Sequence, residues 1–487
     1  MTMKQRSGNL FWTASNARHA LRYRGALRDP RRSQEKLLFD YLMHNADSAY
    51  GREHRFAEIR SVEEFQDRLP VVSYEELEPW IDRIRAGEKK VLTTEPVLLL
   101  EKTSGSSGAT KYIPYTASLL REFRRAVGAW MFDLFTRRPR LLGGAQYWSI
   151  SPLSGEVERT AGGIPIGLAS DLDYFAPFDR WALKRTLAVP EEVAQIADIQ
   201  ESRRRTMKHL VRCRDLRFIS VWNPSFLTLL MSELPSGRVP RDIWPRLELI
   251  SCWTSGASAR CLPELQERFP GVEIQGKGLL ATEGVVSFPR IASPAPIPAI
   301  TSHFLEFLSD DGLVHRVDEL EVGGRYSVLI TTGGGLVRYD LGDQVKVVAP
   351  GAIEFIGRRG QVSDLCGEKL NEVFVGGIIE QVAERIGLGG FAMLAPEWGS
   401  PPRYLLFAKS TRVGEAASSI EAALRESFHY DYCRRLGQLD PVEGIRVSGP
   451  ETDYLRGCEA LGQRVGDVKP TYLRRELDWR ERMAKNA

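Results

Sequence analysis

The stretch that decides the fold is residues 101–111, which read Glu-Lys-Thr-Ser-Gly-Ser-Ser-Gly-Ala-Thr-Lys. The apolar run at 97–100 before it predicts a buried strand, and a helical pattern begins near Ala117 after it. Glycines and small hydroxyl residues between two such elements leave backbone N–H groups free and let a phosphate approach closely, because glycine has no Cβ. The stretch predicts a nucleotide-phosphate cradle, although Ser/Gly clusters are more commonly plain loops.

Two features of this stretch favour the phosphate role. The hydroxyls of Ser104, Ser106 and Ser107 can donate hydrogen bonds to phosphate oxygens, and the Lys111 ammonium follows directly. The stretch is not a Walker loop, because no Gly-Lys-Ser/Thr closes it at the required spacing.

Composition sets the bounds. The chain has 487 residues, 43% hydrophobic and 26% charged, which is typical of a soluble globular protein with a large core. A net charge of +3 does not call for nucleic acid or an anionic membrane as a partner. Six cysteines are scattered without a Cys-x-x-Cys pair, which argues against a zinc site and a disulfide framework and predicts reduced thiols.

Targeting and partner signals are weak. No apolar segment follows the first residues as in a signal peptide, and no run approaches the ~18 apolar residues of a membrane span, so we expect a cytoplasmic protein. Basic residues gather in two places, and we interpret both as solvated helix faces rather than nucleic-acid sites. The first group is Arg18, Arg22, Arg24, Arg28, Arg31 and Arg32, and the second surrounds Arg203 to Arg214.

The chain up to residue 281 alternates helical and strand patterns, which indicates an α/β fold. Ser-x-x-Glu sequences at Ser61 and Ser73 predict helix starts, and the apolar spacing over 117–135 predicts a long core-facing helix. Strands are expected at 217–222, 247–253 and 273–281, each ending in a small polar loop. Ligands of open α/β sheets lie beyond the carboxyl ends of the strands, so these loops predict a shared rim.

From residue 303 to 355 the strands become closely spaced. Gly323-Gly324 predicts a hairpin that joins 320–322 to 326–330. Asp340 and Asp343 follow, and a carboxylate there can accept hydrogen bonds from ribose hydroxyls, although aspartates are more often turn formers. After a boundary near 354–361, a helix at 372–385 opens a smaller α/β unit.

The order of several short motifs resembles the adenylate-forming superfamily. The motifs are Thr-Ser-Gly-Ser-Ser-Gly-Ala-Thr-Lys at 103–111, Thr-Glu at 282–283, Tyr-Asp-Leu-Gly-Asp at 339–343, Gly-Arg at 357–358, Gly-Glu-Lys at 367–369 and a final Gly-Gln-x-x-x-x-x-Lys-Pro at 462–470. Within that superfamily the runs at 50–56 and 111–116 are similar to the acyl acid amido synthetases, the auxin-responsive family. The resemblance spans nearly the whole chain.

This resemblance implies a two-step reaction on a large N-terminal domain (1–357) and a small mobile C-terminal domain (358–487), both α/β. A carboxylic acid reacts with ATP to give an acyl-adenylate, and an amine, expected to be an amino acid, then displaces AMP. ATP and Mg²⁺ are the implied cofactors, with neither nucleic acid nor a membrane as partner.

The resemblance also assigns residues. It implies that the triphosphate is held by Thr103, Ser104, Ser106, Ser107 and Lys111, and that adenine lies against Ser255, Gly256 and Ala257. Thr282 would contact the α-phosphate and Glu283 would bind Mg²⁺. Asp343 and Arg358 would hold the ribose, and Lys469 would stabilise the charge that develops during adenylation.

The chain departs from the family pattern at the hinge, where Gly360-Gln361 stand in place of the usual charged residue. The final lysine motif is also longer than in plant members, and the plant acyl-pocket residues are not recognisable. Two alternatives stay open: an acid–thiol (acyl-CoA) ligase of the same superfamily, or a non-catalytic nucleotide-binding relative.

Overall fold

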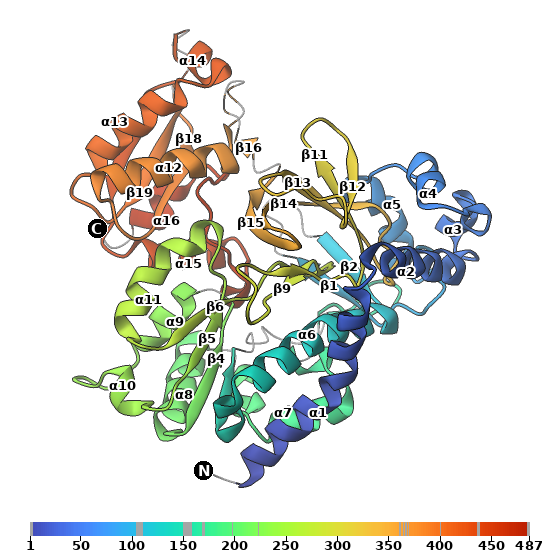
Figure 1. The fold of residues 1–487 in the computed structure, drawn as a ribbon. Helices are drawn as coiled ribbons and strands as arrows, with labels where there is room; N and C mark the ends of the chain where they lie inside the picture. Colours follow the sequence, from blue (N-terminus) through green and yellow to red (C-terminus); the bar gives the residue numbers. More distant parts are fainter. Residues whose placement is uncertain are drawn as a thin grey trace. The chain divides into compact units, whose positions relative to one another are not determined.

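A computed structural model describes residues 3–103, 111–149, 158–167, 171–196, 198–222, 224–359, 362–363, 365, 368, 370–399, 401–435 and 439–484 (Figure 1). The chain forms two compact units. The first unit contains Met1–Ser220, Pro240–Ser251 and Val272–Phe355, and the second contains Val221–Val239, Cys252–Gly271 and Ile356–Ala487.

The N-terminal part of the first unit is helical, and its helix starts are those that the sequence predicts. The Ser61 hydroxyl accepts from the Glu64 amide at 3.0 Å, and the Ser73 amide donates to the Glu76 carboxylate at 2.7 Å within a full capping box. The helices are α1 (Met3–Ala26), α2 (Pro30–Asn45), α4 (Val62–Arg68) and α5 (Tyr74–Arg85). Helix α1 agrees with the interpretation of the basic group at Arg18 to Arg32 as a helix face, and its buried positions mix Asn9 and Asn16 with apolar residues such as Trp12.

The long helix α6 (Ala117–Arg137) confirms the prediction for 117–135. Thr116 caps it by accepting from the Leu119 amide at 3.2 Å. It packs along α1 most tightly at Gly128, where an added Cβ would lie 2.4 Å from Asn16 Oδ1. Only a residue without a side chain fits this crossing.

The decisive stretch begins inside a strand. Strand β1 (Leu99–Thr103) pairs antiparallel with β2 (Lys111–Tyr115), so Thr103 lies opposite Lys111. The strand predicted at 97–100 therefore starts later and includes the first three residues of the stretch. Residues 104–110 lie outside the described part of the chain.

A four-stranded sheet confirms the α/β prediction for the middle of the chain. Its order is β3 (Ala145–Trp148), β4 (Leu216–Ser220), β5 (Leu249–Cys252) and β6 (Glu273–Gly276), with β3–β4 and β4–β5 parallel. Helix α8 (Ile199–Arg212) lies between β3 and β4 in the chain. The expected strand at 273–281 is interrupted, since β6 ends at Gly276 and β7 (Leu280–Ala281) belongs to a separate hairpin.

A five-stranded sheet follows in the order β12–β11–β13–β14–β15. Its strands are β12 (Val314–Arg316), β11 (Phe304–Ser309), β13 (Arg325–Thr331), β14 (Tyr339–Ala349) and β15 (Ala352–Arg358). The predicted hairpin from 320–322 into 326–330 is wrong, because β13 pairs with β11 and β14 instead. Gly323 adopts a φ of +90° and its amide donates to the Val347 carbonyl at 2.7 Å, so this segment forms a turn beside β14.

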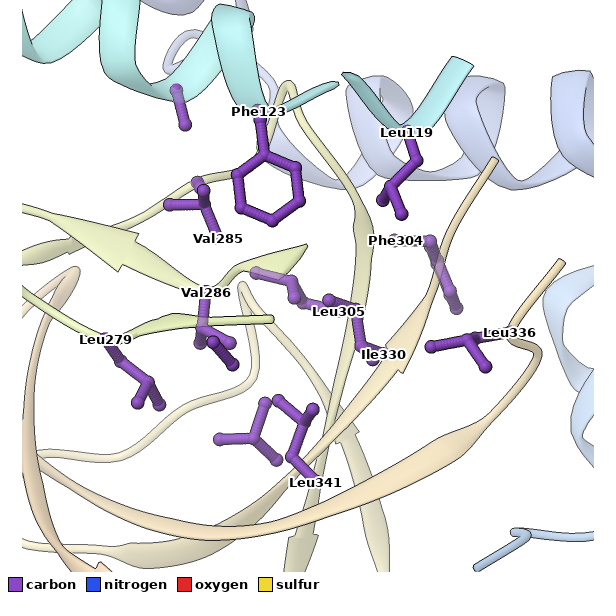
Figure 2. Close-up of a cluster of buried hydrophobic side chains, with 14 of the residues drawn as sticks. Leu119, Phe123, Leu279, Val285, Val286, Phe304, Leu305, Ile330, Leu336 and Leu341 are labelled. Carbon is purple, nitrogen blue, oxygen red and sulfur yellow. The ribbon is translucent and has the colours of Figure 1, made fainter. Parts of the chain in front are cut away.

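The core of the first unit joins α6 to this sheet, as Figure 2 shows. Leu119 and Phe123 descend from the helix towards Val285, Val286 and the strand residues below them. All of the side chains drawn there are apolar and buried, so the hairpin that carries Val285 rests on a dry, packed base.

The second unit has its own core around β18 (Ala392–Glu397), β19 (Arg403–Ala408) and β20 (Glu443–Arg446). Helix α12 (Glu372–Ile386) confirms the predicted helix and ends at Gly387, which has a φ of +70°. Helix α13 (Val413–Leu424) ends before α14 (Phe428–Arg435) begins.

Some features concern the whole described chain. The cysteines Cys213, Cys252, Cys261, Cys433 and Cys458 are free thiols, and Cys366 lies outside the described residues. Within the ranges given above, no helix is long and apolar enough to cross a membrane.

Candidate active site

The predicted pair Thr282 and Glu283 forms a tight turn. It joins β7 to β8 (Gly284–Val285), which are antiparallel. Tyr115, the last residue of β2, donates its phenol hydrogen to the Thr282 carbonyl at 2.6 Å. The structure thus brings the strand that follows the serine-rich stretch into direct contact with the predicted α-phosphate and metal residues.

The surroundings of this turn keep Tyr115 in its protonated form. Burial raises the pKa of Tyr115 well above its ordinary value, and the Tyr174 hydroxyl at 3.1 Å and the carboxylates of Glu101 and Glu283 add to the effect. The phenol is therefore a fixed hydrogen-bond donor at any pH at which the protein is folded.

A buried pair of polar residues holds the next part of the same hairpin. His303 Nε2 accepts from the Val285 amide at 3.0 Å, and this places the ring proton on Nδ1. That nitrogen lies 3.1 Å from the Glu122 carboxylate, which also accepts from the Gly333 amide at 3.1 Å. These contacts connect helix α6 to the β7–β8 hairpin and to the segment between β13 and β14. They reach the hairpin at Val285, two residues after Glu283.

Sequence reasoning missed this pair. Neither His303 nor Glu122 was singled out from the sequence. The signal was present, since a glutamate in an otherwise apolar core-facing stretch must find a buried partner.

Glu283 is 6% exposed, and its carboxylate is the predicted Mg²⁺ ligand. Among the described residues no group of three or more His, Cys, Asp and Glu side chains could hold a metal without help. Mg²⁺ is usually bound through one or two carboxylates together with substrate phosphates. A single carboxylate at this turn fits Mg²⁺ that arrives with a nucleotide, and does not form an all-protein metal cage.

Asp343 lies on β14 and is fully buried. The register between β13 and β14 shifts opposite this part of the strand, and Gly342 adopts a φ of +70°. The Gly342 amide donates to Asp340 Oδ1 at 2.8 Å, so Asp340 has a local turn-forming role. Irregularities of this kind re-aim side chains beside functional sites.

The phosphate cradle is described only at its two ends. Thr103 and Lys111 face each other across the β1–β2 pair. Lys111 Nζ lies 3.9 Å from Glu75 and 5.2 Å from the centre of the Tyr74 ring. The predicted contacts of Ser104, Ser106 and Ser107 fall on residues outside the described part of the chain.

The second unit contains the remaining predicted residues. Ser255 precedes the short helix η5 (Gly256–Cys261), which starts with Gly256 and Ala257. Lys469 Nζ lies 5.1 Å from the centre of the Trp253 ring, two residues before Ser255. The second unit therefore places the predicted catalytic lysine beside the predicted adenine segment. Arg358 is the last residue of β15.

The backbone next to Lys469 is anchored although its side chain is only half-buried. Tyr454 Oη donates to the Lys469 carbonyl at 2.7 Å. The lysine itself meets the aromatic face through a cation–π contact, which has little directional preference.

A second buried lysine was not predicted. Lys277 is 3% exposed and follows β6, and its Nζ donates to Ser220 Oγ at 2.6 Å. The rings of Trp130 and Trp148 lie 5.4 Å and 5.8 Å from this ammonium. Trp148 and Ser220 end parallel strands, so the charge lies at the sheet edge where ligands of α/β proteins bind.

Comparison with known proteins identifies related families. The model of the GH3 family N-terminal domain matches residues 22–237, and that of the GH3 family central domain matches 297–358. Together the two matches cover more than half of the 487 residues. The indole-3-acetic acid-amido synthetase GH3.10 of Arabidopsis thaliana is 23% identical over 481 residues, covering 79% of this chain and 80% of that protein.

Solved structures share the fold. The AtGH3.15 acyl acid amido synthetase in complex with 2,4-DB has a TM-score of 0.79 at 17% identity, over 94% of this chain and 93% of that one. A 2-hydroxyisobutyryl-CoA ligase in the postadenylation state is more distant, with a TM-score of 0.54 at 14% identity over 92% and 90% of the two chains.

Proposed function

Because this chain belongs to the GH3 family of acyl acid amido synthetases, we propose that it joins a carboxylic acid to an amine in two steps that consume ATP. In the first, a carboxylate oxygen attacks the α-phosphorus and pyrophosphate leaves. In the second, the amine nitrogen attacks the acyl carbon, loses a proton and displaces AMP. The observation that carries this proposal is the Thr282–Glu283 turn, locked to β2 through Tyr115.

The first unit would hold most of the nucleotide. Thr103, Ser104, Ser106, Ser107 and Lys111 would bind the triphosphate, which the paired strand ends at Thr103 and Lys111 support. Thr282 would bind the α-phosphate, and buried Asp343 would accept the ribose hydroxyls, with help from Arg358.

Glu283 would hold Mg²⁺ through one carboxylate, and the ion would supply positive charge against the phosphate oxygens. The fixed phenol of Tyr115 and the Glu122–His303 pair would keep the turn at one angle. Positioning of this kind is the main contribution that a protein makes to phosphoryl-group chemistry.

The second unit would supply adenine contacts and a mobile charge. Ser255, Gly256 and Ala257 would line the adenine pocket. We place a mobile domain at 358–487, and its Lys469 would offset the negative charge that develops during adenylation. The half-buried Lys469 on an aromatic face supports a side chain that changes partners between the two half-reactions.

We place an aromatic carboxylic acid as the first substrate. The rings of Tyr115 and Tyr174 are 5.9 Å apart and those of Phe123 and Tyr174 are 5.3 Å apart, so an aromatic cluster adjoins the Thr282 carbonyl. Indole-3-acetic acid, named for the Arabidopsis relative, is an acid of this class. An amino acid as acceptor, and a cytoplasmic location, stay predictions of the sequence.

Acid-dependent exchange of labelled pyrophosphate into ATP tests the first step. We expect exchange with aromatic carboxylic acids in a panel that also contains aliphatic and fatty acids. A lack of exchange with every acid would indicate a non-catalytic nucleotide-binding relative.

Product analysis then tests the second step. The most active acid is supplied with ATP and either a mixture of amino acids or coenzyme A. We expect an amide and AMP with amino acids. A thioester formed only with coenzyme A would instead identify an acid–thiol ligase.

A further inference from the structure

Five arginines meet at a surface hollow between α1 and α6 in the first unit. We call it the arginine hollow, and its volume is about 470 Å³. Its lining residues are Arg18, His19, Arg22, Arg121, Arg124, Arg125 and Ala176. In a chain with a net charge of only +3, this is a strong local concentration of positive charge.

Most of these charges have no carboxylate at ion-pair distance, although Asp40 acts to raise the pKa of Arg22 and Asp179 that of Arg124 from farther away. Arg121 lies 3.1 Å from Glu95. Among the described residues, no carboxylate lies within 4.0 Å of the guanidinium groups of Arg18, Arg22, Arg124 or Arg125. Arg124 and Arg125 donate only to the backbone carbonyls of Tyr174 and Thr301. The hollow therefore presents several guanidinium groups that an anion would neutralise.

His19 reports the electrostatic environment of the hollow. Its pKa falls from 6.5 to about 4, first through burial and then through the positive charges of Arg18, Arg125 and Arg22. Burial also lowers the pKa of Arg22, and the neighbouring Arg125 lowers it further. These charges come from both helices that form the walls.

Backbone packing holds the charges together. The helices α1 and α6 approach most closely at Gly128, beside Asn16 and His19. The arginines on α6 lie one to two turns before this crossing, and those on α1 lie beside it or one turn after His19. The packed helices therefore keep the backbone positions of these arginines close together.

We propose that the arginine hollow binds a small molecule that carries two or more phosphate groups. Its volume lies within the range of about 300–1,000 Å³ that is usual for small-molecule sites. Guanidinium groups bind phosphate oxygens through paired N–H donors, and several of them suit a ligand with more than one phosphate.

This site has its own lining residues and adjoins the proposed active site. Glu122 of α6 faces His303 and the β7–β8 hairpin, whereas Arg121 and Arg125 line the hollow. Arg121 points about 100° away from Glu122, Arg125 lies three residues after it on a neighbouring face, and Arg124 donates to the carbonyl of Tyr174. The ligand therefore need not be the nucleotide of the adenylation reaction.

Binding of inorganic tripolyphosphate to the full chain tests the proposal, with citrate as a carboxylate probe. The variant carries Arg22→Gln and Arg125→Gln. Its control carries Arg24→Gln and Arg137→Gln, on the same two helices but outside the hollow. By calorimetry at low salt we expect at least tenfold weaker tripolyphosphate binding in the variant at this site, and unchanged binding in the control.

Titration of the His19 resonance in the unsubstituted chain gives a local readout that active-site binding does not move. An anion in the hollow stabilises the imidazolium, so tripolyphosphate should raise the pKa of His19 from about 4 by at least one unit. An unchanged pKa, or equal binding by variant and control, would overturn the proposal. Citrate binding as tightly as tripolyphosphate would overturn the assignment to phosphate.

Discussion

The Thr282–Glu283 turn and Lys469 are both expected to act on the same reacting phosphate, yet the protein holds them in opposite ways. The turn accepts a hydrogen bond from the buried Tyr115, and two residues further on the Val285 amide donates to His303, which lies against Glu122. Lys469 has an anchored backbone, and its half-buried ammonium lies on the Trp253 ring.

This difference indicates a division of labour. Directional bonds in a dry interior fix an angle, and breaking one leaves a buried polar group without its partner. A cation on an aromatic face keeps its charge and gives up little when it leaves. The turn is thus fixed by buried contacts, and we expect the lysine to be the part that moves.

The largest expected effect is on the buried pair. His303→Leu leaves the Glu122 carboxylate and the Val285 amide without this partner in the core, so the free energy of unfolding should fall by about 3–5 kcal/mol. Urea denaturation measures it. His315→Leu, at a part-buried histidine that contacts Ser309, is the control and should cost less. Equal losses would show that the pair does not hold the turn.

Next is the mobile charge. Lys469→Ala should lower acid-dependent pyrophosphate exchange by about 10²- to 10³-fold, the effect of removing one group that stabilises transition-state charge. ATP affinity and the urea midpoint should stay the same, because the side chain is only half-buried. Lys409→Ala, exposed in the same unit, is the control. Exchange at the original rate would remove Lys469 from the mechanism.

A smaller effect is expected at the bond between β2 and the turn. Tyr115→Phe deletes the hydroxyl that donates to the Thr282 carbonyl, which is worth about 0.5–1.5 kcal/mol, or up to about tenfold in exchange rate. Tyr174→Phe keeps this bond and should change exchange less. If Tyr174→Phe had the larger effect, the phenol pair rather than the Thr282 contact would matter.

The smallest effect is expected at the aromatic face. Trp253→Leu removes the cation–π contact of Lys469, worth about 0.5–1 kcal/mol at an exposed site, so exchange should fall about two- to fivefold. Trp253→Phe keeps an aromatic face and should retain more activity. A rise in exchange would mean that Trp253 restrains the lysine from reaching the phosphate.

Features that depend on neighbours along the chain could be predicted from the sequence. Short-range residue spacing predicts the helix starts at Ser61 and Ser73, helix α6 and the strands of the parallel sheet. The structure contains all of these elements. Periodicity does not reveal the buried polar positions of α1, such as Asn9, which donates to the Gly144 carbonyl. The hairpin prediction at 320–322 was wrong because β13 pairs with β14, a strand that the turn at Gly323 does not connect to it directly.

The residues of the candidate site also fall into those that the sequence predicted and those that it did not. Ordered motifs named Thr282, Glu283, Asp343 and Lys469 through family resemblance, and their roles stay predictions. Contacts between residues far apart in the chain could not be predicted from the sequence, because the spacing of residue types along the chain does not show which buried side chains contact each other. Glu122 with His303, Lys277 with Ser220 and Lys469 with Trp253 are all of this kind.

The glycine at position 128 has a further consequence for the N-terminal helix. Because α1 packs closely on α6 at Gly128, the like charges of both helices are held near one another in the folded chain. Dissolved ions screen such repulsion, with a Debye length of about 10 Å at 0.1 M salt and about 30 Å at 0.01 M. Dilute buffer is therefore the condition in which α1 separates most readily, and added electrolyte strengthens its attachment.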